Sequence, residues 1–230
     1  MLILGIDTSG KTASVAVYDS EKEVFLSEAS IYTKLTHSQV IMPLCSDVLK
    51  RAEKNLGDID IISVANGPGS YTGLRIGVSS VKAMSFGTGC KVCGISTLES
   101  MAYNNISFSG FICPVMKARE NLVYTSVYLP NDSCLDEIMK ESIISQEELA
   151  EYLLSLDSDV ILCGDGSVEF YEKYKEKSDD FFKLAPPNLR LQNACGICLA
   201  SVNKDSSDPE ALEVSYLQKV KAEKDLENNK

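Results

Sequence analysis

The sequence predicts an α/β protein of two related lobes, each with a mixed β-sheet and flanking helices. Three observations support this prediction. Residues 2–30 contain three short runs of alternating apolar and polar residues, as the strands of a β-meander do. A helix, a buried strand, a glycine-rich turn and a second helix follow. The same order of elements begins again, in a weaker form, after about residue 105. We therefore expect one lobe over residues 1–104 and another over 105–230.

The first lobe shows a regular alternation of strand and helix patterns. Its expected elements are strands at 2–7, 13–18 and 23–30, a helix at 36–55, a strand at 60–66, a helix at 74–86, a strand at 91–95 and a helix from 97. Thr36 can cap the first helix because its hydroxyl can accept a hydrogen bond from a backbone amide. Pro43 lies inside that helix and predicts a kink or a later start.

The second lobe shows the same patterns less clearly. Its expected elements are strands at 111–117 and 122–129, a helix at 146–155, a strand at 159–163, a turn at 164–166 and a helix at 168–176.

The composition is that of a folded globular protein. Of the 230 residues, 44% are hydrophobic and 24% are charged, so the chain can bury a substantial core. No apolar run approaches the roughly 20 residues that span a bilayer. No basic segment precedes the apolar residues that follow Met1. We therefore expect a cytoplasmic protein with no membrane segment.

The net charge of −11 lies mainly in the second lobe. Residues 1–100 carry nine Lys and Arg against ten Asp and Glu, whereas residues 101–230 carry 13 against 23. Such a chain lacks the basic stripe that neutralises phosphates, so we expect contact with RNA only through a partner. The nearly neutral first lobe suits a protein interface, because interface cores are depleted in charged residues.

The cysteines and the single histidine limit the possible chemistry. The eight cysteines lie mostly in apolar runs and are expected to be reduced core thiols. Two C-x-x-C pairs, at 90–93 and 195–198, are about a hundred residues apart, whereas zinc ribbons place such pairs some 15–20 residues apart. His37 is the only histidine, which excludes H-E-x-x-H and two-histidine metal sites. No G-x-S-x-G is present to complete a triad with it. We therefore expect no catalytic residue and no metal site.

Residues 5–12 match the P-loop pattern G-x-x-x-x-G-K-[ST]. That mechanism needs a helix directly after the lysine, so that helix amides face the phosphates. Residues 13–18 instead alternate with the period of a strand. A hairpin turn over 7–10 is therefore favoured, of the kind that actin-like ATPases and sugar kinases place beside nucleotide phosphates. An ordinary polar hairpin is the alternative.

Three glycines, at 67, 69 and 73, follow a strand and open a helix. A Rossmann site is not supported, because the strand does not begin a βαβ unit and no acidic residue follows about 20 positions on. The loop can still let backbone amides approach an anion. The alternative is that the glycines serve turn geometry and close helix packing. The expected phosphate-facing residues are Asp7, Thr8, Ser9, Gly67, Gly69, Ser70, Thr72, Gly73 and Arg75.

Four strings stand out by their order and spacing: Leu4-Gly5-Ile6-Asp7-Thr8-Ser9, Thr36-His37-Ser38, Gly67-Pro68-Gly69-Ser70-Tyr71-Thr72-Gly73-Leu74-Arg75-Ile76-Gly77 and Gly94-Ile95-Ser96-Thr97-Leu98. In order and spacing they resemble the TsaB (YeaZ) family, and the third string is long and highly specific. Shorter matches at Ala118-Arg119, at 164–166 and at Tyr216-Leu217 extend the similarity over almost the whole chain. The second lobe departs from the family pattern at Lys117, where Asp is usual, and at Gln218, where Arg is usual.

The resemblance implies an actin-like (ASKHA, ribonuclease-H-like) fold and a part in making N6-threonylcarbamoyladenosine in ANN-decoding tRNAs. In that system a TsaD-like paralogue transfers the threonylcarbamoyl group and a TsaE-like ATPase joins the complex. The chain would then be no enzyme by itself and would need no cofactor of its own, although ATP or ADP could lie at the partner interface. TsaB-like chains were also once grouped with glycoproteases.

Our leading hypothesis is a non-catalytic scaffold that binds the TsaD-like paralogue through the helices at 36–55 and 74–86. The same surface could form a homodimer when the paralogue is absent. The expected interface residues are His37, Val40, Ile41, Leu44, Val48, Leu74 and Val78.

The alternative is an independent actin-like ATPase or small-molecule kinase, suggested by the hairpin over 7–10 and the loop over 67–73. Phosphate release by the purified chain, abolished by Asp7→Ala, would favour it.

Overall fold

Two five-stranded mixed sheets organise the computed structural model, which describes residues 1–32 and 36–217. The first sheet has the order β3-β2-β1-β4-β5, with β1 (Leu2–Asp7), β2 (Thr12–Asp19), β3 (Val24–Tyr32), β4 (Ile61–Gly67) and β5 (Lys91–Ser96). The second has the order β10-β9-β6-β7-β8, with β6 (Phe111–Lys117), β7 (Leu122–Asn131), β8 (Cys134–Ser145), β9 (Val160–Cys163) and β10 (Phe182–Leu184). Gln218, noted above, lies outside the described residues.

Both sheets have the same topology. In each, three antiparallel strands form a meander, and the first of them also pairs in parallel with the fourth strand. The fifth strand then pairs in parallel with the fourth. This repetition confirms the predicted fold class, an actin-like α/β fold of two related lobes.

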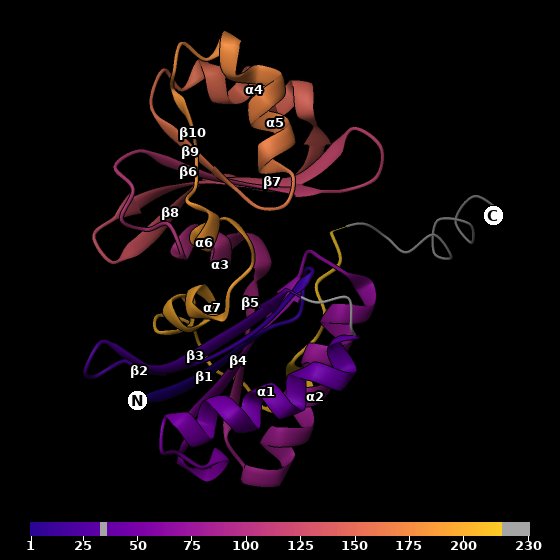
Figure 1. Cartoon of the computed structure of the whole chain (residues 1–230), viewed down its shortest axis with the longest axis vertical. Coiled ribbons are helices and arrows are strands. Elements are labelled where there is room, and N and C mark those ends of the chain that lie inside the picture. The colour runs from indigo at the N-terminus through magenta and orange to yellow at the C-terminus, as the bar shows by residue number, and fades with distance from the viewer. Residues whose placement is uncertain (33–35, 218–230) are drawn as a thin grey trace, which may run out of the picture.

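The helices and sheets form alternating layers (Figure 1). Helices α1 (His37–Arg51) and α2 (Tyr71–Thr88) cover the outer face of the first sheet, and α4 (Gln146–Ser155) and α5 (Ser167–Tyr174) cover the outer face of the second. Between the sheets lie α3 (Thr97–Tyr103), α6 (Pro187–Arg190) and α7 (Ala194–Ser201). Three short 3-10 turns are η1 (Leu56–Asp58), η2 (Lys175–Lys177) and η3 (Pro209–Ala211). Within these described residues no helix is both long and apolar enough to cross a membrane.

Helix α7 packs on the first sheet although it lies late in the chain. It contacts β1, β2 and β4, and it also packs along α3. Ile197 and Cys198 are fully buried there. Gly5 makes the close approach possible, because a Cβ at this position would lie 2.6 Å from the Cys198 sulfur. Spatially α7 therefore belongs with the first sheet, whereas the sequence boundary at residue 104 placed it with the second.

The last described segment, residues 205–217, returns along the first lobe as a strap. Ser207 exchanges two backbone hydrogen bonds with Val92 of β5, at 3.0 and 2.8 Å. Leu212 is buried in the core formed by α1, α2 and the first sheet. The Ser215 amide then donates to the Asn66 carbonyl at 2.7 Å. The strap thus ends beside the glycine-rich loop.

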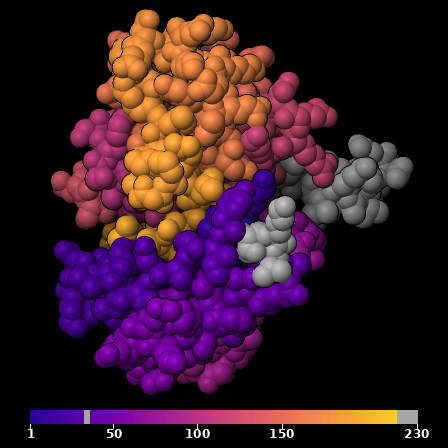
Figure 2. Space-filling view, viewed as in Figure 1, coloured from indigo at the N-terminus to yellow at the C-terminus, as the bar shows by residue number. Residues whose placement is uncertain are grey.

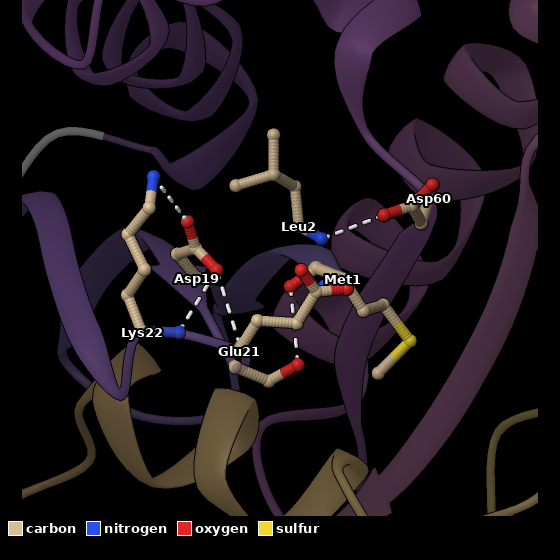
Figure 3. Close-up of polar contacts among 7 residues, drawn as sticks. Met1, Leu2, Asp19, Glu21, Lys22 and Asp60 are labelled. Carbon is tan, nitrogen blue, oxygen red and sulfur yellow. Dashed lines mark hydrogen bonds and ion pairs between the residues drawn. The ribbon is translucent and has the colours of Figure 1, made fainter.

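Polar contacts fix the amino-terminal end of β1 (Figure 3). The terminal amine of Met1 forms an ion pair with Glu21 at 2.9 Å, and the Leu2 amide donates to Asp60 Oδ2 at 2.7 Å. These contacts tie β1 to the turn after β2 and to the residue before β4. The opposite, carboxyl ends of β1 and β4 carry the hairpin turn and the glycine-rich loop.

Several elements differ from the sequence prediction at their ends. Helix α1 begins at His37, runs without interruption through Pro43 and ends at Arg51, four residues before the expected end. Thr36 occupies the N-cap position, but its hydroxyl contacts the Ser38 hydroxyl instead of a helix amide. Helix α2 begins at Tyr71, inside the glycine-rich loop, because Ser70 caps it by accepting a hydrogen bond from the Gly73 amide.

Four elements of the second half were not predicted: β8, β10, α6 and α7. Strand β8 carries charged residues at 136, 137, 140 and 141 and lies at the edge of its sheet. Edge strands tolerate such residues because one side of the strand faces solvent. Its pattern therefore lacks the apolar alternation that identifies a strand in sequence.

Candidate functional site

A cleft of about 670 Å³ lies between the two lobes, at the carboxyl ends of the central strands. Its first-lobe wall comes from the β1–β2 turn and the glycine-rich loop, and its second-lobe wall from the β6–β7 turn and the start of α5. Ligands of open α/β sheets usually bind at the carboxyl ends of strands. In Figure 2 the two lobes meet across the middle of the molecule, with the yellow-orange segment that contains α6 and α7 between them.

The Asp7 carboxyl group is closed off from the cleft. It is completely buried, and its Oδ1 accepts hydrogen bonds from the Ser9 amide at 2.8 Å and the Ser9 hydroxyl at 2.6 Å. Its Oδ2 has no hydrogen-bond partner among the described residues. Burial raises the pKa of this carboxyl group to about 6, and the two bonds from Ser9 limit the rise.

The hairpin turn and the glycine-rich loop pack directly on each other. The Thr8 hydroxyl donates to the Gly73 carbonyl at 2.8 Å, and the Ser70 amide donates to the Ser9 carbonyl at 2.7 Å. A Cβ at Gly73 would collide with the Thr8 carbonyl oxygen. The glycine at 73 thus allows close packing of the hairpin turn on α2.

The expected phosphate-facing residues therefore fall into three groups. Ser9, Gly69 and Ser70 line the cleft. Buried beneath the surface are Asp7, Thr8, Gly67 and Gly73. Thr72 and Arg75 lie on the outer side of α2, in a separate shallow depression. That these nine residues face a phosphate stays a prediction.

Arg75 makes contacts of its own on the surface of α2. Its Nε donates to the Tyr216 hydroxyl at 3.1 Å, and its guanidinium carbon lies 4.0 Å from the centre of the Tyr71 ring. The rings of Tyr71 and Tyr216 stack with their centres 5.3 Å apart. The hydrogen bond to Tyr216 raises the pKa of Arg75. This stack joins the strap to the start of α2.

His37 supports the hairpin turn. Its Nε2 lies 2.7 Å from the Gly10 carbonyl oxygen, and its ring also packs against Gly73, since a Cβ there would lie 3.3 Å from His37 Cδ2. With Nε2 donating to this carbonyl, Nδ1 is the free ring position, and it has no partner among the described residues. The only histidine is thus built into the support of the turn.

Six of the seven expected interface residues are core residues, which corrects the prediction. These six, which are buried against the first sheet or between α1 and α2, are Val40, Ile41, Leu44, Val48, Leu74 and Val78. The apolar stripe of a helix on a sheet is used by the lobe itself, so these side chains are not free for a partner. Only the outer faces of α1 and α2 remain available.

The outer face of this helix pair carries exposed apolar residues. Met42 on α1 is 46% exposed and Phe86 on α2 is 63% exposed. A shallow groove of about 510 Å³ runs beside Met42, and its other apolar lining residues are Cys45, Leu49, Leu56 and Met84. We use the name outer helix face for this groove together with Met42 and Phe86.

The remaining motifs have structural explanations. A strand, β2, directly follows Lys11, so the P-loop arrangement of a helix after the lysine is not formed. All eight cysteines are free thiols, and five are buried, as expected for core residues, but Cys134 is exposed. In residues 1–32 and 36–217 no group of three or more His, Cys, Asp or Glu is placed to hold a metal ion.

Sequence reasoning missed the cations of the cleft. Lys11, Lys117 and Arg119 all line it, as does the strap residue Tyr216. The internal repeat could have pointed to them. The β6–β7 turn of the second lobe corresponds to the β1–β2 turn of the first. The repeat therefore places both turns at the cleft.

These features define an actin-like α/β protein with a cleft between two repeated lobes. A family model described as "TsaD: tRNA N6-adenosine threonylcarbamoyltransferase" matches residues 31–195. The "tRNA threonylcarbamoyladenosine biosynthesis protein TsaB" of Bacillus subtilis is 33% identical over 71% of this chain and 71% of its own length. The Escherichia coli protein of the same name is 28% identical over 72% of each chain. The chain belongs to the TsaB family.

Solved structures agree with the fold. YeaZ from Pseudomonas aeruginosa superposes with a TM-score of 0.74 at 22% identity, covering 94% of this chain and 99% of that chain. A second structure, described as an uncharacterized protein with similarity to peptidase YEAZ from Pseudomonas aeruginosa, has a TM-score of 0.77, also at 22% identity and with the same coverage. Both lobes are therefore shared with these proteins.

Proposed function

We propose that this chain is a non-catalytic subunit in the formation of N6-threonylcarbamoyladenosine in ANN-decoding tRNAs, where it binds and supports a TsaD-like paralogue. The relatives named above are biosynthesis proteins of this modified nucleoside. The match of residues 31–195 to the TsaD family model supports a partner of the same fold. Proteins that share a fold can pair through equivalent helices, as in symmetric dimers.

The observation that carries the proposal is the outer helix face. Met42 and Phe86 project from two helices whose inner faces already fill the core. Isolated apolar residues are common on protein surfaces, but Met42 also lines a groove with partly buried Leu56, and the floor of this groove is formed by the core residues Cys45, Leu49 and Met84. An interface of ordinary size buries about 800 Å² per partner, which two helices of this length can provide.

The contacts of Asp7, Thr8 and His37, which lie outside the lining of the cleft, favour a supporting role over a catalytic one. The Asp7 carboxyl group is covered by Ser9, the ring of His37 is held by the Gly10 carbonyl, and the Thr8 hydroxyl donates to Gly73. Each of these groups makes a structural contact with the hairpin turn or the glycine-rich loop, which favours a role in supporting the turn.

The other partners are proposed on the basis of the family resemblance. A TsaE-like ATPase would join the complex of the two paralogues, and tRNA would be bound through the complex, because the net charge of −11 disfavours RNA on this chain alone. Without the paralogue, the outer helix face would pair with a second copy of the chain. ATP or ADP would be bound where the partners meet.

Reconstitution tests the proposal. Unmodified tRNA is incubated with a threonylcarbamoyl-AMP synthase, the TsaD-like paralogue and the TsaE-like ATPase, with and without this chain, and the modified nucleoside is measured by mass spectrometry. We expect modification only when the chain is present. Modification at the same rate without it, or modification by this chain in the absence of the paralogue, would overturn the proposal.

Substitutions on the outer helix face test whether tRNA modification depends on this surface. Met42→Asp together with Phe86→Asp should lower the rate at limiting protein by about tenfold or more, since desolvating two carboxylates in an interface weakens binding by well over ~1.4 kcal/mol. The matched control is Ile138→Asp on β8, which is 43% exposed and lies in the other lobe. The control should leave the rate unchanged.

A further inference from the structure

A second, smaller cavity lies between the lobes, at the amino-terminal end of β1 and therefore away from the cleft. Its volume is about 230 Å³. The first lobe contributes the end of β2 and the β2–β3 turn, which adjoin the start of β1, and the second lobe contributes the β7–β8 turn. Residues at the ends of α3 and α7 complete the lining. We call this space the small interlobe cavity.

Two carboxylates line the small interlobe cavity, one from each lobe. Glu23 comes from the β2–β3 turn and Asp132 from the β7–β8 turn. No Lys, Arg or His lines the cavity with them. Neither carboxylate forms an ion pair with a residue in the described ranges 1–32 and 36–217. The cavity therefore holds two negative charges that the described part of the chain does not neutralise, and such a site attracts cations.

The Tyr18 side chain adds a polar group to the cavity. Tyr18 lies at the end of β2 and is only 7% exposed, but it lines the cavity. Its hydroxyl forms no hydrogen bond with another described residue. Burial raises the pKa of Tyr18, and the negative charge of Glu23 adds to the rise. A buried tyrosine hydroxyl usually has a hydrogen-bond partner, so a ligand in the cavity can supply one here.

Much of the remaining lining is apolar. It includes the ring of Tyr103, which is 6% exposed, and the side chains of Ile106, Leu199 and Val202. Aromatic rings attract ammonium groups through their negative faces, and aliphatic walls favour a hydrocarbon chain. The volume is below the usual range of about 300–1,000 Å³ for small-molecule sites. The lining thus suits a small ligand with one cationic end and one apolar end.

We propose that the small interlobe cavity binds a small protonated amine with a short hydrocarbon chain, through the carboxylates of Glu23 and Asp132 and the hydroxyl of Tyr18. An alkylammonium group has three N–H donors, and each of these side chains has an oxygen that can accept one. A metal ion suits the site less well, because no group of three or more His, Cys, Asp or Glu in the described part of the chain is placed to hold one. The scaffold role proposed above does not depend on this site.

An NMR titration of the full-length chain, labelled with ¹⁵N, tests the proposal at pH 7. The probe is n-butylammonium, and the matched controls are butan-1-ol, which is neutral, and butyrate, which is anionic. We expect saturable shifts with a Kd of about 1 mM or below for n-butylammonium, and a Kd at least about tenfold higher for both controls. No saturable shift up to about 20 mM n-butylammonium would overturn the proposal. So would a Kd for either control within about tenfold of that for n-butylammonium, because the charge would then play no part.

Neutral substitutions place the binding in the cavity. Glu23→Gln with Asp132→Asn should raise the Kd of n-butylammonium by about tenfold or more. Glu53→Gln with Asp157→Asn makes the same chemical change outside the cavity, at exposed residues that share the positive φ of the first pair, and should leave the Kd unchanged. Equal weakening in both pairs would show a nonspecific charge effect and overturn the assignment. Should the first pair fail to fold, Asp132→Asn alone provides the same comparison against Asp157→Asn.

Tyr18→Phe tests the hydroxyl separately. Because this hydroxyl has no hydrogen bond to the described part of the chain, the variant should keep the thermal unfolding temperature of the parent. It should raise the Kd of n-butylammonium by about threefold or more. An unchanged Kd would contradict the contact assigned to Tyr18.

Discussion

Asp7 illustrates how strongly position determines the properties of a single side chain in this protein. In sequence it stands in a hairpin turn and was expected to face a phosphate. In the structure it is fully buried, hydrogen-bonded to Ser9 and left with one unpartnered oxygen. Because burial raises its pKa from 3.8 to about 6, its charge destabilises the folded state at neutral pH.

The pH dependence of stability follows from this shift. Between about pH 4 and pH 6 the folded state holds the proton of Asp7 more tightly than the unfolded state, so the contribution of Asp7 to stability falls as the pH rises. Asp7→Asn removes this titration. The variant should be more stable than the parent at pH 8, by roughly 1 to 3 kcal/mol, and the difference should vanish below about pH 4.

Urea unfolding of both proteins at several pH values measures this difference. Asp205→Asn, the same substitution at an exposed position, is the control. If the difference in the free energy of unfolding between Asp7→Asn and the parent stays constant from pH 4 to pH 8, the result contradicts the burial of a charged Asp7.

Replacing either of two glycines of α2 with alanine should change the free energy of unfolding, but in opposite directions. Gly73→Ala places a methyl group against the Thr8 carbonyl oxygen, and overpacking of this kind costs about 1 to 3 kcal/mol. Gly87→Ala meets no atom within 4 Å and should stabilise the helix by roughly 0.5 to 1 kcal/mol. Chemical denaturation of the two variants measures both effects, and an equal response of the two positions would contradict the close packing of the hairpin turn on α2.

At the scale of elements, the strap shows how the end of the described chain contributes to the first lobe. Leu212 is inserted in the same core as α1 and α2, and Ser207 pairs with β5. Leu212→Ala should therefore lower the free energy of unfolding by about 2 to 3 kcal/mol. Glu213→Ala, the exposed neighbour, should change it by less than about 0.5 kcal/mol. Equal small effects in denaturant unfolding would show that the strap is not part of the lobe.

The elements that were predicted well have strong local signals. Helix α4 was predicted with the bounds that it has, and Ser145 and Glu148 form a capping box at its start. The three strands of the first meander are short runs bounded by turn residues, and they were found within two residues of their ends. By contrast, β8 carries charges of an edge strand and α7 is apolar on every side. Neither shows a period that sequence reasoning can recognise.

The candidate site was harder to predict because it depends on contacts between distant segments. The glycine-rich string and the hairpin could be read from sequence, and Ser9, Gly69 and Ser70 do line the cleft. The expected interface residues were chosen for their helical spacing, but that spacing describes the stripe that faces the sheet. The position of Tyr216 on Arg75 depends on the path of the strap, which no local pattern reveals.

At the scale of the whole molecule, two lobes of one topology have different surfaces. The outer helix face of the first lobe carries exposed apolar residues, whereas the second half of the chain carries most of the negative charge. Charge repulsion disfavours close association through the acidic half. This difference between the lobes supports the proposed docking of a protein partner on the first lobe.

Sedimentation velocity of the chain mixed with its TsaD-like paralogue tests this account most directly. The account predicts a heterodimer that forms with the parent chain and with Ile138→Asp, and whose Kd rises by about tenfold or more with Phe86→Asp. A heterodimer that forms equally well with Phe86→Asp and Met42→Asp combined, or no association of the parent chain with the paralogue, would contradict it.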